Sequence, residues 1–159
     1  MDIKSQAISK EAVRHFLESN FIAELATASN NKPTCSTVIY VVDKDLNLYF
    51  VTNRDSHKAE NILKNQNVSM TIWEFSKMSI QLDGLAKEVN DDSIKEWVIN
   101  SFGDAATNDP DFWAPIFRIN RGDYVIFKVT PTWLRALDLA HDTVRSKLSP
   151  YTEISLHED

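Results

Sequence analysis

Apolar positions along the first half of the chain change their period, and each change predicts a new element. Residues 9–19 carry an apolar stripe at helical spacing beside charged side chains, which predicts an amphipathic helix. The stripe comprises Ala12, Val13, Phe16 and Leu17. Segments rich in apolar and β-branched residues then predict strands at 21–29, 34–42 and 48–52, separated by short turns at 30–33 and 43–47. Such short turns favour antiparallel pairing, because parallel strands need a long crossover.

The second half repeats this alternation less regularly. Helices are predicted at 56–65 and from 91 to 102, and strands at 68–73, 78–89 and 124–131, the last extended by 132–138. We expect the 78–89 strand to bend at Gly84. We also expect Asp91 or Asp92 to cap the 91–102 helix. Its predicted buried side is Ile94, Trp97, Val98 and Ile99. Residues 103–123 show no element of their own, and the weakly patterned segment 141–159 is interpreted as a tail or a partner-binding arm.

About six antiparallel strands with two or three helices indicate an α+β, mainly β, domain or a small barrel. The length of 159 residues fits one domain over 1–159, with its core at about 10–138. A six-stranded barrel is filled by its own side chains, so a ligand is expected outside it or between subunits. Trp73 and Trp133 lie at predicted strand ends, where aromatic residues commonly seal a barrel.

Composition excludes several classes of function. The net charge of −6 disfavours nucleic-acid binding, and with three glycines the chain has neither glycine-rich nucleotide fingerprint. Its four histidines show no metal-ligand spacing, so no metal site is expected. The single cysteine, Cys35, is typical of a reducing cytoplasm and is interpreted as a small buried hydrophobe. We find no signal peptide and no apolar run of membrane-spanning length, so a cytoplasmic location is expected.

The helix predicted at 56–65 has its charges at the unexpected end. Ser56 is a good N-cap, but His57 and Lys58 follow at once and Arg54 precedes it. Cations oppose the helix dipole there, whereas free N–H groups with added cations are well suited to phosphate. Thr52 and Asn53 before them add a hydroxyl and an amide. The alternative interpretation is that the basic side chains simply extend into water.

The stretch "FVTNRDSHKAENILKNQNVSM" also resembles the signature of the pyridoxamine 5'-phosphate oxidase-like flavin-binding split barrels, including their general stress protein-like branch. The matching positions are Phe50, Thr52, Asn53, Ser56, Lys58, Ala59, Asn65, Val68 and Ser69, with Gln66 in place of the family's proline. The segment "IQLDGLAKEV" is similar to a second family strand, and the resemblance runs from about 10 to 138.

The resemblance implies a homodimeric, six-stranded antiparallel split β-barrel with flanking helices and FMN at the subunit interface. It implies that Thr52, Ser56 and Lys58 hold the FMN phosphate, with His57 where relatives often carry arginine. Ser36, Thr37 and Val51 would lie along the ribityl chain or ring. The phosphate would then be the anion that the basic helix start requires.

The chain departs from the true oxidases at the positions that hold their substrate. Cys35 and Tyr40 replace an arginine and a lysine, Ser79 replaces a flavin-contacting glutamine, and "DLAHDTV" lacks two arginines of a terminal motif. Without these cations a doubly charged phosphate substrate is poorly held, so vitamer oxidation is not expected. No acid or base can be assigned; Tyr40 and His141 are the conceivable groups.

Four functions remain open. The first is an FMN-dependent oxidoreductase acting on a small organic substrate with a nicotinamide or other reductant, with Trp113 as one residue able to close over the flavin. The second is a flavin-binding sensor or store without turnover. The third is a heme-handling protein with His141 or His157 as axial ligand, and the fourth a deazaflavin-using reductase.

Overall fold

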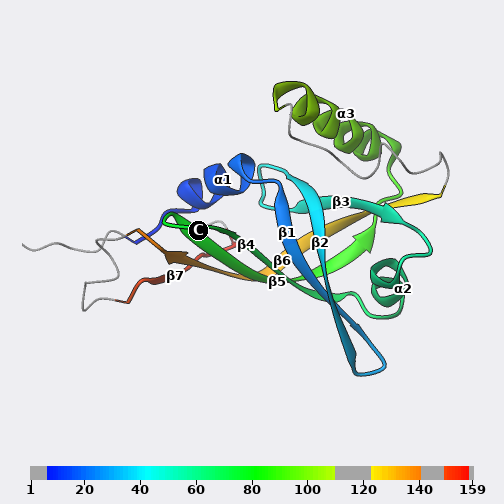
Figure 1. The fold of residues 1–159 in the computed structure, drawn as a ribbon, viewed down its shortest axis with the longest axis horizontal. Helices are drawn as coiled ribbons and strands as arrows, with labels where there is room; N and C mark the ends of the chain where they lie inside the picture. Colours follow the sequence, from blue (N-terminus) through cyan, green and yellow to red (C-terminus); the bar gives the residue numbers. More distant parts are fainter. Residues whose placement is uncertain (1–6, 110–122, 141–148, 158–159) are drawn as a thin grey trace, which may run out of the picture.

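A closed ring of antiparallel strands forms the centre of the protein (Figure 1). The computed structural model describes residues 7–109, 123–140 and 149–157. The elements in these ranges are α1 (Lys10–Ser19), β1 (Ile22–Ser29), β2 (Lys32–Val42), β3 (Leu48–Asn53), α2 (His57–Lys64), β4 (Asn67–Glu74), β5 (Met78–Glu88), α3 (Asp92–Asn108), β6 (Tyr124–Asp138) and β7 (Tyr151–Glu153). The strand order is β3-β2-β1-β4-β5-β6-β7, and β3 also pairs with β6. Six strands therefore close on themselves, and β7 adds an outer strand.

The ring is split between β2 and β3. These strands pair only from Tyr40 opposite Phe50 to Val42 opposite Leu48, and then diverge. Helix α2 is tethered beside β1, where Asn61 Nδ2 donates to Thr27 Oγ1 at 3.1 Å and Asn65 Nδ2 donates to the Ala28 carbonyl at 3.0 Å. The mainly β, antiparallel split-barrel class predicted from the sequence is confirmed.

The core lies inside the ring, and two helices pack against it. Helix α1 buries Val13, Phe16 and Leu17, while α2 buries Ala59 and Ile62 in the same cluster. Figure 1 shows α1 and α2 at different ends of the barrel. Ala12, expected in the stripe of the first helix, is exposed, because the buried stripe is centred on the other three positions.

A bulge bends the long strands β5 and β6, as the sequence predicted at Gly84. Asp83 pairs with Trp133 and Gly84 with Pro131, so Thr132 has no partner in the register. A Cβ atom on Gly84 would lie 2.7 Å from the backbone oxygen of Thr130. Only glycine fits this approach without a backbone shift.

Helix α3 packs outside the barrel and differs from its prediction in two ways. It buries Val98 and Phe102 against a second cluster that contains Tyr49 and Ile126. Trp97, expected in the core, is 39% exposed and touches the Tyr49 ring edge-on, because it lies at the border of this contact. The helix also continues to Asn108, through residues expected to be a connection, since alanines favour helix there.

The C-terminal segment is partly built into the sheet. Strand β7 pairs with β6, and the Ile154 side chain is buried in the barrel core. The Ile8 amide donates to Thr152 Oγ1 at 3.2 Å, so the segment before α1 contacts β7. The interpretation of 141–159 as a tail is therefore wrong for this part. The apolar pattern of this segment is weak because, among its described residues, Ile154 is the one buried side chain beside the three paired residues of β7.

Candidate functional site

Helix α2 begins at His57 because Ser56 provides the cap. Ser56 is extended, with φ −72° and ψ 149°, and its Oγ accepts from the Ala59 amide at 3.3 Å. The first backbone bond of the helix runs from the Glu60 amide to the Ser56 carbonyl at 3.0 Å. Within the described residues, the backbone N–H groups of His57 and Lys58 have no acceptor. Two donors are thus left at the helix start, as expected for an α-helix.

Two hydroxyl groups meet beside these donors. Thr52 Oγ1 and Ser56 Oγ lie 3.1 Å apart and share a hydrogen bond. Thr52 is buried near the end of β3, where its pairing with Val125 of β6 fixes its position. Both hydroxyls are therefore held in place before any ligand binds.

Lys58 adds a positive charge to the same helix start. Its side chain is half-buried, and burial lowers the pKa of its ammonium group. No carboxylate of the described residues lies within 4.0 Å of Lys58. A partly desolvated cation without a counter-ion is unfavourable in the free protein and favours binding of an anion.

Arg54 does not add to this charge, although the sequence suggested that it could reach the same point. Its guanidinium forms an ion pair with Glu88 at 2.6 Å. The hydrogen bond from Arg54 lowers the pKa of the Glu88 carboxyl. The Arg54 amide also donates to the Asp123 carbonyl at 2.9 Å, which fixes the turn between β3 and α2. Arg54 is an anchor of the turn, and the exposed His57 lies next to Lys58 at the helix start.

The remaining predicted residues divide between two faces. Side chains alternate along a strand, so Ser36 shares the inner face of β2 with Val38, while Thr37 is exposed on the outer face. Val51 faces outward from β3 and packs against the cluster under α3. Asn53 is exposed at the end of β3. Thr52 and Ser56 are in direct contact and Lys58 lies in the first turn of the same helix, whereas the side chains of Ser36 and Thr37 cannot face one point.

Several other residues singled out in the sequence lie in environments that differ from those predicted. Tyr40 is buried and its hydroxyl donates to the Leu17 carbonyl at 2.9 Å; burial raises its pKa, so it is a core residue and not an acid or base. Cys35 is exposed and not buried, because it points outward from β2. Trp73 is 56% exposed and does not seal the barrel. Trp113 and His141 lie outside the described residues.

Two features are absent from the described parts of the chain. No three His, Cys, Asp or Glu side chains come together there as a metal site. No described helix is both long and apolar enough to span a bilayer. The start of α2 itself offers hydrogen bonding and charge: two backbone donors, a pair of hydroxyls that bond to each other, and one ammonium. This donor set fits a phosphate monoester.

Solved structures share this fold at low sequence identity. General Stress Protein 26 from Bacillus anthracis has a TM-score of 0.59 and 22% identity over 78% of this chain and 92% of its own. A FAD-binding protein from Mesorhizobium loti has a TM-score of 0.64 and 17% identity over 82% and 95%. The heme storage protein HutZ from Vibrio cholerae has a TM-score of 0.60 and 17% identity over 81% and 94%. A search of curated proteins finds no match.

A family model covers most of the chain. The model described as pyridoxamine 5'-phosphate oxidase matches residues 9–138, from the start of α1 to the end of β6. The match includes the β3–α2 segment with its hydroxyl pair and Lys58. The chain therefore belongs to the pyridoxamine 5'-phosphate oxidase family.

Proposed function

We propose that this protein binds FMN, with the phosphate at the start of α2. The observation that carries the proposal is Lys58: a half-buried ammonium beside free helix amides, with no carboxylate of the described residues within 4.0 Å. The Thr52–Ser56 hydroxyl pair uses one of its two protons for its own hydrogen bond and can donate the other to the same phosphate. Membership of a family that commonly binds flavin supports the identity of the ligand.

The ligand is expected to extend from α2 along the split between β2 and β3. Ser36 lies on the inner face of β2, on the same side as Thr52, and is proposed to contact the ribityl chain. Thr37 and Val51 face the other side and would approach a ring that passes over the strand edge. Asn53 and His57 are exposed beside the phosphate and are proposed as its outer contacts.

We further propose that the protein is a homodimer with the flavin at the subunit interface. The outer face of β1 and β4 carries large exposed apolar side chains, Ile22 at 50% and Trp73 at 56%. Contiguous apolar side chains on a sheet face are typical of a surface covered by a partner. A second copy on this face would exclude water from the flavin ring.

Bound FMN would supply redox chemistry, namely hydride or electron transfer to a small organic substrate. The protein's part is to hold the phosphate, orient the ring and exclude water. The cations that hold substrate in the true oxidases are replaced here by Cys35 and Tyr40, and Tyr40 is engaged in the core. Oxidation of phosphorylated vitamers is therefore not proposed.

Titration of the purified protein with FMN and with riboflavin tests the proposal. The two ligands share the ring and ribityl chain and differ in the phosphate, so FMN should bind at least about tenfold more tightly. Equal affinities would contradict a phosphate site at α2, and failure of both to bind would contradict flavin binding. The visible spectrum of the protein as isolated separates flavin bands from the Soret band of a heme protein.

A second measurement separates an enzyme from a passive flavin binder. If the protein is an oxidoreductase with a nicotinamide donor, NADH or NADPH should bleach the bound flavin, and an added acceptor should restore its colour. Persistent colour with both donors would instead support a flavin store or sensor. Analytical ultracentrifugation with and without FMN tests the homodimer.

A further inference from the structure

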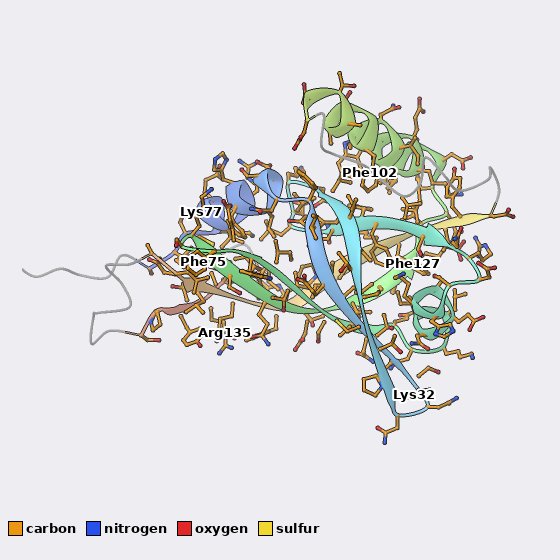
Figure 2. The ribbon with its side chains drawn as sticks, viewed as in Figure 1. Lys32, Phe75, Lys77, Phe102, Phe127 and Arg135 are labelled. Atoms are coloured by element: carbon orange, nitrogen blue, oxygen red, sulfur yellow. The ribbon has the colours of Figure 1, made fainter. Side chains whose placement is uncertain are left out.

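A cavity lies on the outer face of the barrel, away from the start of α2. Its volume is about 490 Å³, within the range of small-molecule sites. Its walls come from the end of α1, from β1 and from the β4–β5 turn. Figure 2 labels Phe75 and Lys77 on this turn, and Lys77 lines the cavity. The apolar part of the wall is formed by Phe21, Ile22 and Trp73.

The cavity contains one carboxylate without a cation. Glu24 lies on β1, half-buried, and within the described residues its side chain has no hydrogen bond or ion pair. The other two charged residues of the wall neutralise each other, because Lys77 Nζ lies 2.5 Å from Glu74 Oε1. The net charge of the cavity wall is therefore that of Glu24.

The polar wall at the end of α1 offers mainly acceptors to a ligand. Ser19 Oγ donates its only proton to the His15 carbonyl at 2.8 Å. Asn20 Nδ2 donates to the Phe16 carbonyl at 2.9 Å, which leaves the amide oxygen available. Together with Glu24, these oxygens suit a ligand that donates hydrogen bonds.

We propose that this cavity binds a small organic cation with an apolar body, such as a primary amine carrying an aromatic or alkyl group. The Glu24 carboxylate pairs with the ammonium, the oxygens of Ser19 and Asn20 accept its remaining protons, and the exposed Trp73 ring packs on the apolar body. An anion is repelled by Glu24, and a neutral molecule leaves that carboxylate unpaired.

The cavity lies on the face proposed above as the subunit interface, because Ile22 and Trp73 belong to both, and it adjoins the proposed flavin position. Glu24 pairs across the sheet with Thr37 of β2, so their side chains are neighbours on the outer face. The cation would then be a substrate or effector beside the flavin. This placement rests on the proposed function, whereas cation binding by the cavity does not.

Calorimetric titration of the full chain with benzylamine, which is positively charged at pH 7, tests the proposal. Benzyl alcohol serves as the neutral probe and benzoate as the anionic one, each with FMN-free and FMN-saturated protein. Benzylamine should bind saturably and at least about tenfold more tightly than benzyl alcohol, and benzoate should not bind. Equal affinity for benzylamine and benzyl alcohol would overturn the proposal.

Glu24→Gln provides the decisive variant, because it keeps the shape and removes the charge. Its affinity for benzylamine should fall at least about tenfold while that for benzyl alcohol stays unchanged, which also reports that the cavity is intact. Glu96→Gln removes an equal charge from the exposed face of α3 and should change neither affinity. An unchanged benzylamine affinity in Glu24→Gln would refute the site. Benzylamine binding without FMN binding would refute the proposed function alone.

Discussion

Helices α2 and α3 begin with different caps, although both lie on the outside of the same barrel. The Asp91 carboxylate at α3 accepts from the amides of Ser93 at 2.9 Å and Ile94 at 3.0 Å. Among the helix amides, the Ser56 hydroxyl at α2 accepts only from that of Ala59, at 3.3 Å. The second helical residue therefore has a satisfied amide in α3 and a free one, on Lys58, in α2.

The charges at the two helix starts also differ: α3 begins with acidic residues and α2 with basic ones. In α3, Asp91 and Asp92 complement the positive end of the dipole, and Lys95 lies 3.7 Å from Asp92. In α2 the first two residues are His57 and Lys58, and the only first-turn acid, Glu60, is exposed. The chain satisfies these α3 amides by itself, whereas at α2 the proposed phosphate would do so. An unfavourable local arrangement is thus a sign of binding when a matched arrangement nearby is satisfied.

The largest effect is expected when α2 is given the cap of α3. In Ser56→Asp the new carboxylate would accept the free amides, neutralise Lys58 and repel a phosphate. We expect FMN affinity to fall at least about 100-fold, because a charge-assisted contact is lost and like charges are brought together. The FMN-free protein should keep its free energy of unfolding or gain about 0.3–1 kcal/mol from the helix dipole.

FMN titration and urea unfolding measure the two effects of Ser56→Asp. The reciprocal control is Asp91→Ser in α3, which should leave FMN affinity unchanged. Tight FMN binding by Ser56→Asp would show that α2 is an ordinary helix start and that its cations only extend into water.

A smaller loss is expected from Lys58→Ala. Removing a charge-assisted hydrogen bond should cost about 1.5–3 kcal/mol of FMN binding free energy, or roughly 10- to 150-fold in Kd. Riboflavin has no phosphate, so its affinity for Lys58→Ala should equal its affinity for the unaltered protein. Lys95→Ala in the first turn of α3 is the matched control and should have no effect on either ligand. Equal losses for FMN and riboflavin would mean that Lys58 acts through the fold.

Most of the barrel could be predicted from the sequence because its strands and helices repeat clear apolar periods. The parts that could not be predicted depend on the placement of single side chains. Strand β7 depends on Ile154, and the half-exposed Trp97 lies at the edge of the α3 contact, which an apolar stripe alone does not locate. A hydrophobic pattern identifies a buried face but not its border.

The candidate site was predictable where it is local. Ser56 and Lys58 lie two residues apart at one helix start, so their spacing in the sequence was sufficient to predict that they share it. Arg54 was misjudged because Glu88, its partner, is 34 residues away and is brought close only by the end of β5. Strand alternation could have separated Ser36 from Thr37, since consecutive residues of a strand face opposite sides. Glu24, a lone charge within the predicted strand 21–29, was the available signal for the cavity on the outer face.

The pH dependence of binding should also distinguish α2 from α3. Burial lowers the pKa of Lys58 below the ordinary lysine value of 10.5, so Lys58 loses its charge at lower pH than an exposed lysine. FMN affinity should fall as pH rises through this lowered pKa, by no more than the loss in Lys58→Ala. Between that pKa and 10.5 the unfolded chain binds more protons, so the FMN-free protein should gain stability with rising pH.

Comparison with Lys58→Met isolates this contribution. The variant retains much of the apolar stem and has no ammonium, so the alkaline fall in FMN affinity and the gain in stability should both disappear. Calorimetric titrations and urea unfolding over the alkaline range provide the two measurements. The same alkaline fall in Lys58→Met would assign the titration to another group.

The smallest expected effects come from removing each cap. Asp91→Ala and Ser56→Ala should each cost about 1 kcal/mol in the free energy of unfolding, because each leaves helix amides without an acceptor. Only Ser56→Ala should also weaken FMN binding, since its hydroxyl is proposed to donate to the phosphate. Urea unfolding of the FMN-free proteins and FMN titration give the two quantities for each variant. If Asp91→Ala weakens FMN binding as much as Ser56→Ala does, then cap loss acts through general stability, and the difference between the two helix starts is structural and not functional.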